Sequence, residues 1–167
     1  MSSLNRKDYL AKLASEGAVD KMSSSDGADP FDLRRFVDAQ ERVYGTVLDE
    51  LRAGRKHGHW IWFVFPQLRT LGRSPTAIRF GIASLAEAAA YLDHDVLGPR
   101  LRECAQLVAR IEGSSADEIF GWPDNLKVRS SMTLFARATT DNADFRAVLD
   151  RFYDGVEDSL TVEQLAQ

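Results

Sequence analysis

Three short segments of this chain combine aromatic side chains with polar groups, and these are the places where it could do chemistry. They are GHWIWFVFPQ from Gly58, GRSPTAIRFGI from Gly72 and IFGWPDNLKVRSSMTLF from Ile119. All three tryptophans and five of the nine phenylalanines lie in them. Aromatic rings most often pack in a core, where each buries about 150–250 Å². A ring that stays partly exposed next to a cation or a hydroxyl is instead suited to binding a flat ligand.

One candidate anion site lies at the start of a predicted short helix. Arg73 and Ser74 come directly before Pro75, a residue that fits the first helical position because it has no N–H to lose. Free backbone N–H groups and the helix dipole favour an anion there. Ser74 could equally act only as the N-cap of this helix.

A second group of donors follows Asp124 and consists of Lys127, Arg129, Ser130 and Ser131. Lys127 comes three residues after Asp124, so the two side chains share one face if a helix begins there. A solvated helix face is the alternative explanation for the cations.

Common nucleotide, nucleophile and metal motifs are absent. The chain has no Gly-x-Gly-x-x-Gly, no phosphate-loop Gly-Lys-Ser/Thr, no His-Glu-x-x-His and no Gly-x-Ser-x-Gly. His57 and His59 would need distant partners to hold a metal. The single cysteine, Cys104, falls on an apolar helix face, where a buried thiol is the usual occupant. We therefore expect no metal and no cofactor.

The formal net charge of −4 conceals an uneven distribution. The 36 residues between Glu50 and Glu87 contain no Asp or Glu, and their six cations are Arg52, Arg55, Lys56, Arg69, Arg73 and Arg79. A segment of charge +6 is thus embedded in a background of −10. The acidic remainder argues against a nucleic-acid binder that acts through its overall charge.

The elements that must position these residues are predicted to be helices. Residues 1–28 read as a flexible tail and linker, with a possible short helix from Asp8 to Ala14. A long helix is expected from Asp29-Pro30 to Gly54, and HWIWFVFPQL is a core segment that could be a strand or a helical turn. Further helical patterns start near Ser74, Ser84, Val96, Pro123, Phe145 and Thr161, and Ser115 opens another turn. Six or seven helices in residues 29–167 predict one all-α domain.

Length and hydropathy indicate how many domains the chain forms and where in the cell it would be found. A chain of 167 residues suffices for one domain with its own core. It has no apolar run long enough to span a bilayer, and its polar N-terminus lacks the apolar stretch of a signal peptide. We expect a cytoplasmic protein that does not bind membranes.

Four motifs in one order resemble a known family. HWIWFVFPQL, GRS, YLDHDVLGPRL and IFGWPDNLKVRSSMTLF are similar to segments of the small bacterial Rv1873-like proteins, a family of domains of unknown function. The resemblance covers residues 29 to 165 and implies a multi-helical fold. The name calpastatin, sometimes given to this family, has no physical support here, because calpastatin inhibitory segments are disordered and polar.

A more remote resemblance concerns function. The helical architecture and the motifs that carry Trp, Arg and Lys look somewhat like NADAR domains, which are associated with NAD and ADP-ribose derivatives and some of which cleave N-glycosidic bonds. This resemblance implies that Asp124, Glu87 and Lys127 are candidates for the acidic and lysine residues of that group. If the protein is an enzyme, an N-glycosidase-like hydrolase would use Asp124 and Glu87 as its acid and base.

Our leading hypothesis is an aromatic pocket with a cationic rim that binds a small phosphorylated, nucleotide-like ligand such as an ADP-ribose derivative. Trp60 or Trp62 would stack on a base, while Arg73 and Lys127 would bind phosphate oxygens. The full set of expected ligand-binding residues is His59, Trp60, Trp62, Gln67, Arg73, Ser74, Lys127, Ser130 and Ser131.

Two other functions use the same residues differently. In a protein-interaction module without catalytic activity, the aromatic segments would only form core and the basic segment would dock an acidic protein partner. Binding of single-stranded nucleic acid by stacking on Trp ranks last, because it conflicts with the acidic remainder.

Overall fold

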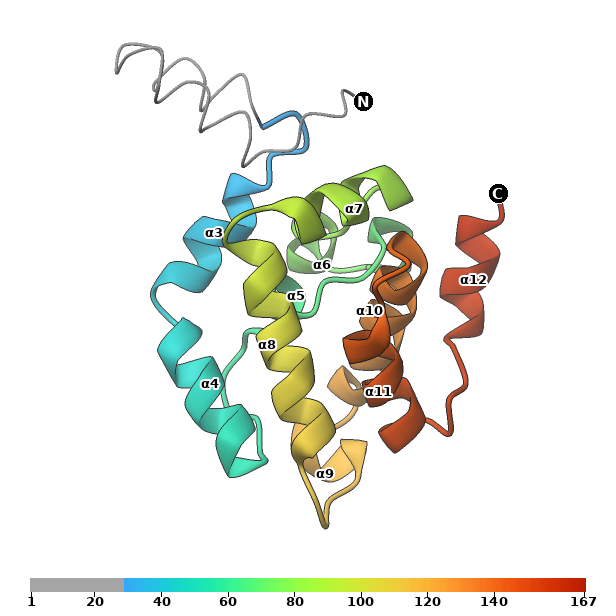
Figure 1. Ribbon diagram of the computed structural model, residues 1–167. Coiled ribbons are helices and arrows are strands. Elements are labelled where there is room, and N and C mark those ends of the chain that lie inside the picture. The colour runs from blue at the N-terminus through green and yellow to red at the C-terminus, as the bar shows by residue number, and fades with distance from the viewer. Residues whose placement is uncertain (1–28) are drawn as a thin grey trace.

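Amphipathic sequence patterns fold into helices throughout the part of the chain that the structure describes. The computed structural model describes residues 29–167 and is all-helical, as expected (Figure 1). The predicted tail and the possible helix from Asp8 to Ala14 lie outside the described residues. Within residues 29–167 the one β-type contact is an isolated parallel bridge between Leu68 and Ile82.

The described residues contain more helices than the six or seven expected. Residues 29–167 form ten α-helices and one 3-10 turn: α3 (Arg34–Glu41), α4 (Tyr44–Ala53), α5 (Ile61–Val64), η1 (Arg69–Leu71), α6 (Pro75–Arg79), α7 (Leu85–Asp93), α8 (Leu97–Arg110), α9 (Ala116–Phe120), α10 (Asp124–Ala138), α11 (Ala143–Phe152) and α12 (Ser159–Leu165). The expected long first helix is divided at Arg42 and Val43 into α3 and α4, and the apolar run HWIWFVFPQL supplies the four residues of α5.

The start of the first described helix also differs from the expectation. Asp29 accepts hydrogen bonds from the backbone N–H groups of Leu33, at 2.6 Å, and Arg34, at 3.1 Å. Pro30 lies in a turn, and regular helix begins only at Arg34. The carboxylate of Asp29 therefore does bind free backbone N–H groups, as predicted, but these groups belong to residues four and five positions after Asp29.

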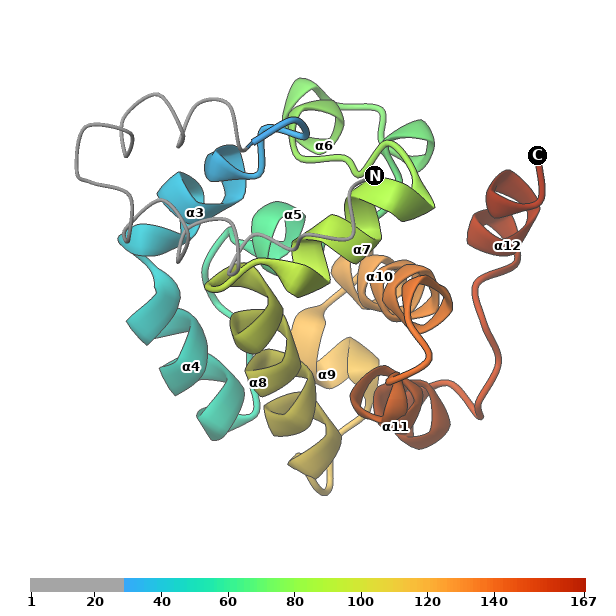
Figure 2. The same ribbon diagram turned by 45° about the horizontal axis from the view of Figure 1, so that its top comes forward.

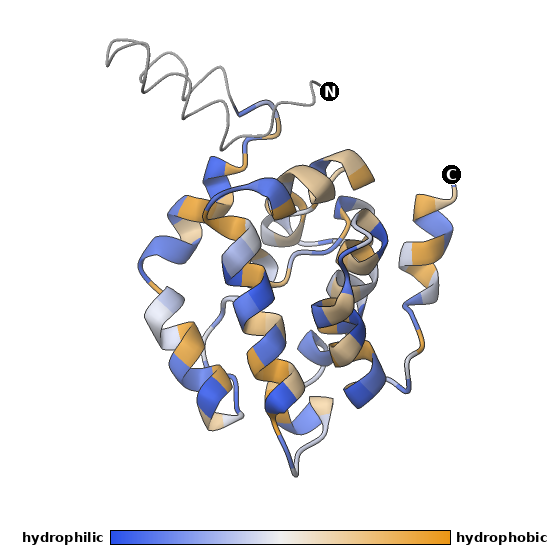
Figure 3. Ribbon diagram, in the orientation of Figure 1, coloured by the Kyte–Doolittle hydropathy of each residue, from blue (hydrophilic) through white to orange (hydrophobic). Residues whose placement is uncertain are grey.

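The helix α10 lies at the centre of the packing. It contacts α7, α9, α11 and α12, while α8 packs against α4, α7 and α11 (Figure 2). Hydrophobic and hydrophilic residues alternate along α8, which buries one face (Figure 3), whereas every residue of α10 from 130 to 136 is buried. No helix within residues 29–167 has both the length and the apolar character needed to cross a bilayer.

Serine caps fix three of the helix starts. The hydroxyls of Ser74, Ser84 and Ser115 each accept a hydrogen bond from the backbone N–H three residues later, at 3.1 Å. Ser115 and Glu118 form a complete capping box. Local sequence thus sets where α6, α7 and α9 begin.

Candidate functional site

The loop between α4 and α5 is held in place by one carboxylate. Oε1 of Glu50 accepts hydrogen bonds from the backbone N–H of His57 at 2.7 Å, that of Gly58 at 3.0 Å and the indole Nε1 of Trp60 at 2.9 Å. Burial alone would raise the pKa of Glu50, but these hydrogen bonds lower it below its ordinary value. The loop that carries Lys56 is therefore rigidly attached to the end of α4.

Lys56 and Asp124 form an ion pair between this loop and the start of α10. The Nζ of Lys56 lies 2.8 Å from Oδ2 of Asp124, and the two side chains are only 7% and 20% exposed. Nζ also donates to the carbonyl of Gly58 and lies 5.2 Å from the centre of the Trp60 ring. The backbone N–H of Lys56 binds the carbonyl of Ile119 at 2.7 Å, which ties the loop to α9.

Lys127 adds a second ammonium group to the same carboxylate. Its Nζ lies 3.6 Å from Oδ1 of Asp124, one helical turn away, and 5.2 Å from the centre of the Trp62 ring. The Lys127 side chain is 24% exposed, and Trp62 is half-buried on α5. We call Lys56, Asp124, Lys127 and Trp62 the lysine–aspartate cluster.

The segment before α10 displays a tryptophan to solvent. Trp122 is 77% exposed and precedes Asp124 by two residues. It follows Gly121, whose φ of 76° lies in the left-handed region that favours glycine, and it is joined to Pro123 by a cis peptide bond. A tryptophan this exposed is uncommon, and it lies two residues before Asp124 in the sequence.

The structure distinguishes between the two tryptophans considered for stacking. Trp60 is 2% exposed, packs against Phe65 and donates its indole N–H to Glu50. Its ring therefore offers no free face to a ligand, whereas Trp62 retains exposed surface under Lys127.

Three of the other expected ligand-binding residues, Arg73, Ser74 and Gln67, form no hydrogen bond or ion pair with the cluster within residues 29–167. Arg73 is exposed, and its side chain makes no hydrogen bond or ion pair with any residue of 29–167. Ser74 caps α6, the alternative role considered for it. The backbone carbonyl of Gln67 accepts a hydrogen bond from Ile82 at 2.9 Å. His59 is exposed in the loop of Lys56.

The two serines of α10 are buried and differ in their hydrogen bonding. Ser130 donates to the carbonyl of Leu126 at 3.1 Å. Ser131 is fully buried, and its hydroxyl has no hydrogen-bond partner among the described residues. It follows Lys127 by one helical turn, on the face that also carries Asp124.

Glu87 lies apart from the lysine–aspartate cluster in a buried ion pair. Its Oε2 is 2.8 Å from Nη2 of Arg35, with side-chain exposures of 3% and 9%, and its Oε1 accepts the backbone N–H of Ala83 at 3.0 Å. Both oxygens are occupied: the contact of Oε2 holds α7 to α3, and that of Oε1 binds the backbone just before α7. We therefore assign Glu87 a structural role.

Lys56 is the cluster residue that sequence reasoning did not single out. It was one of the six cations of the segment without acids, and its position in a short loop before the aromatic run was the available signal. The contact with Asp124 spans 68 positions, so local spacing carries no information about it.

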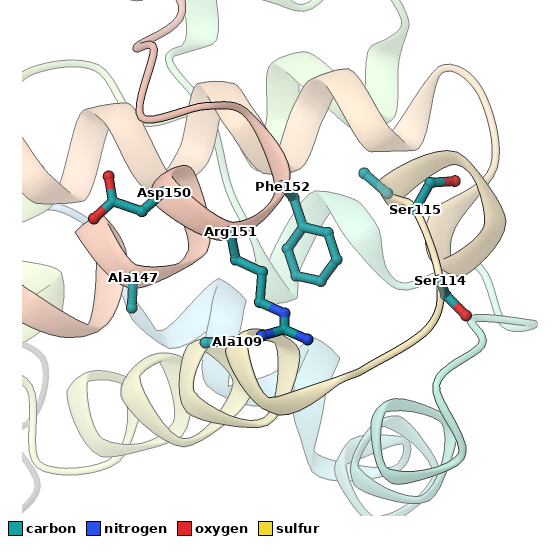
Figure 4. A pocket seen from close by; sticks show the side chains of 8 residues that line it. Ala109, Ser114, Ser115, Ala147, Asp150, Arg151 and Phe152 are labelled. Carbon is teal, nitrogen blue, oxygen red and sulfur yellow. The ribbon is translucent and has the colours of Figure 1, made fainter.

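One cavity within residues 29–167 lies elsewhere and is lined by none of the expected site residues. It measures about 810 Å³ and is open between the end of α8, the start of α9 and α11 (Figure 4). Arg151, Asp150, Phe152 and Ser114 line it. Among residues 29–167, no group of three or more His, Cys, Asp or Glu side chains could hold a metal ion.

Comparison with known proteins places the chain in a family. A family model described as "Protein of unknown function (DUF1810)" matches residues 30–165. The crystal structure of the conserved hypothetical protein Rv1873 from Mycobacterium tuberculosis is similar, with a TM-score of 0.82 and 65% sequence identity over 83% of this chain and 99% of that chain. No curated protein matches the chain.

Proposed function

The chain belongs to the DUF1810 family, and from the geometry of the lysine–aspartate cluster we propose that it binds a small phosphorylated ligand that carries a flat ring. An ADP-ribose derivative has this chemistry. The phosphate would meet Lys127, and the ring would stack on Trp62 or Trp122.

The charges of the cluster support an anionic ligand. One carboxylate lies between two ammonium groups, at 2.8 and 3.6 Å, so the cluster itself contains one more positive than negative charge. The nearby carboxylate of Glu50 is committed to three N–H donors and pairs with neither lysine. Lys127 is the more exposed of the two lysines and forms the longer ion pair, so it is the one able to exchange Asp124 for phosphate.

The observation that carries the proposal is the position of Lys127. Its ammonium group lies 5.2 Å from the Trp62 ring centre while it contacts Asp124, so a charge and a flat apolar face meet at one partly exposed point. Stacking of a base on an aromatic ring contributes about 1–3 kcal/mol, and hydrogen bonds to charged groups contribute about 1.5–3 kcal/mol.

The arrangement supports binding better than hydrolysis. Cleavage of a glycosidic bond ordinarily needs two carboxylates on either side of it. The cluster contains Asp124 alone, and Glu87 is taken up by Arg35 and Ala83. We therefore propose binding as the function and do not assign Asp124 and Glu87 as an acid–base pair.

Thermal unfolding with added ADP-ribose, NAD or inorganic phosphate tests the proposal. A ligand at about one hundred times its Kd stabilises the folded state by about 2.7 kcal/mol, which for a domain of this size raises Tm by roughly 5–11 °C. We expect such a shift with ADP-ribose. An unchanged Tm with all three compounds at saturating concentration contradicts the proposal.

Variants then locate the site. Lys127→Met should weaken ADP-ribose binding by roughly 10- to 100-fold, since one charge-assisted contact is lost. Arg110→Met is the control, because Arg110 is exposed at the end of α8 and has no ion pair within residues 29–167. Equal losses in both variants would show that binding depends only on overall charge.

A further inference from the structure

A recess of about 430 Å³ lies between the start of α3 and the segment that runs from η1 through α6. Its lining includes Phe31, Arg35, Arg69, Arg79 and Glu87. In Figure 2 the start of α3 runs beside α6. Arg35 donates one hydrogen bond to the carbonyl of Arg79 in α6 and another to the carbonyl of Gly81 just after it. Recesses of this size, about 300–1,000 Å³, are typical of small-molecule sites.

Arg35 forms the inner wall and has no donor left for a ligand. Its Nε binds the carbonyl of Arg79 at 2.8 Å, and Nη1 binds the carbonyls of Phe31 and Asp32. Nη2 binds the carbonyl of Gly81 at 2.9 Å and the carboxylate of Glu87 at 2.8 Å. With these bonds Arg35 fixes the shape of the recess and neutralises Glu87.

The other two arginines of the recess have no acidic partner among residues 29–167. Neither Arg69 nor Arg79 forms an ion pair or a side-chain hydrogen bond within residues 29–167, and both are exposed. The guanidinium carbon of Arg79 lies 5.1 Å from the ring centre of Phe80, which is buried.

The backbone beneath these two side chains is fixed. The N–H of Arg69 binds the carbonyl of Ile82 at 2.8 Å. A Cβ added to Gly81 would overlap the backbone of Arg69, so the two segments are in direct contact. The carbonyl of Arg79 accepts from Arg35. Both guanidinium groups thus extend from backbone positions that hydrogen bonds hold in place.

The charge of the recess is positive. Its three arginines face Glu87, which is paired, and Asp32, and Arg69 and Arg79 come from the segment that contains no acidic residue. A guanidinium group is a planar fork of N–H donors that matches phosphate oxygens in pairs.

From these observations we propose that the recess is a second anion site, separate from the lysine–aspartate cluster, and that it binds a compact phosphate monoester or diphosphate through Arg69 and Arg79. Phe31 contributes an apolar wall. The site does not depend on the proposed function, since it shares no residue with that cluster.

Titration of the full chain with inorganic pyrophosphate tests this site. In ¹⁵N NMR spectra the Nε–H signals of Arg69 and Arg79 should shift in a saturable manner, and the Arg69→Gln/Arg79→Gln variant should bind at least about tenfold more weakly. Arg73→Gln is the matched control, because Arg73 is an exposed, unpaired arginine of the same segment that does not line the recess. Its affinity should remain within about twofold of the original.

Equal weakening by Arg73→Gln, or no shift of the two Nε–H signals, would overturn the proposal. Vesicles that contain phosphatidic acid offer the same phosphomonoester on a surface, and the concave site predicts that the double substitution leaves vesicle binding unchanged. Vesicle binding lost in the double variant, without pyrophosphate binding in the original chain, would overturn the assignment to a soluble ligand. Because the readout is at Arg69 and Arg79, it is independent of whether the lysine–aspartate cluster binds ADP-ribose.

Discussion

Arg35→Met tests whether Glu87 is part of the framework. The substitution keeps most of the length of the side chain but leaves Glu87, 3% exposed, without its ion-pair partner. It also removes the donors from four backbone carbonyls. Breaking a buried ion pair by removal of one partner costs about 3–5 kcal/mol, a large part of the 5–15 kcal/mol that is typical of a whole domain.

Urea unfolding at neutral pH measures this loss directly. We expect the free energy of unfolding to fall by about 3–5 kcal/mol and Tm to fall by roughly 6–20 °C. Arg34→Met is the control on the same helix, because the ion pair of Arg34 with Asp38 is exposed at 68% and 69%. That change should alter the free energy of unfolding by less than about 0.5 kcal/mol.

A double-mutant cycle with Glu87→Leu separates the pair from its surroundings. Since the charge of Glu87 is costly only when it is left unpaired, Arg35→Met/Glu87→Leu should be more stable than the sum of the single changes predicts. A loss below about 1 kcal/mol for Arg35→Met would refute this reasoning and reopen Glu87 as a functional carboxylate.

Three further outcomes follow from the packing. Burial raises the pKa of the Cys104 thiol to about 12, so Cys104 should resist thiol reagents near pH 8 until the protein is unfolded; rapid labelling of the folded chain would contradict this. Hydrogen bonds from Arg137 lower the pKa of Glu157 below its ordinary 4.5, so the pair stabilises the fold above pH 4.5 and this stabilisation is lost as the pH falls below that value. The Glu157→Gln variant should therefore show a free energy of unfolding that depends less on pH in that range. An unchanged pH dependence would show that the ion pair does not contribute to stability. Gly98→Ala would force a Cβ onto a backbone carbonyl oxygen of α7 and should destabilise the fold by about 1–3 kcal/mol. Gly45→Ala in α4 meets nothing within 4 Å and should stabilise the fold by about 0.5–1 kcal/mol. Urea unfolding of both variants measures these changes, and equal effects would contradict the packing described.

The helix starts could be predicted because capping is local. Ser74, Ser84 and Ser115 each bind an N–H only three residues away, and that spacing is visible in the sequence. The break between α3 and α4 could not be predicted, because Arg42 and Val43 include neither glycine nor proline and the apolar spacing continues across them.

The candidate site could be predicted only where it follows helical spacing. Asp124 and Lys127 lie three residues apart on α10, and their contact was expected from that spacing. The pairing of Lys56 with Asp124, and the choice between Trp60 and Trp62, depend on how distant segments pack. Trp60 is buried in the core and donates its indole N–H to Glu50, and nothing in the spacing of HWIWFVFPQL indicates this.

The ¹⁵N spectrum of the three indole N–H groups tests the central claim most directly. The full chain contains only Trp60, Trp62 and Trp122, so each indole signal can be assigned by single substitution. During titration with ADP-ribose we expect the signals of Trp62 and Trp122 to shift together with one Kd, while the signal of Trp60, sealed and bound to Glu50, stays in place. Three unmoved signals at saturating concentration, or shifts unaffected by Lys127→Met, would contradict a ligand site at the lysine–aspartate cluster.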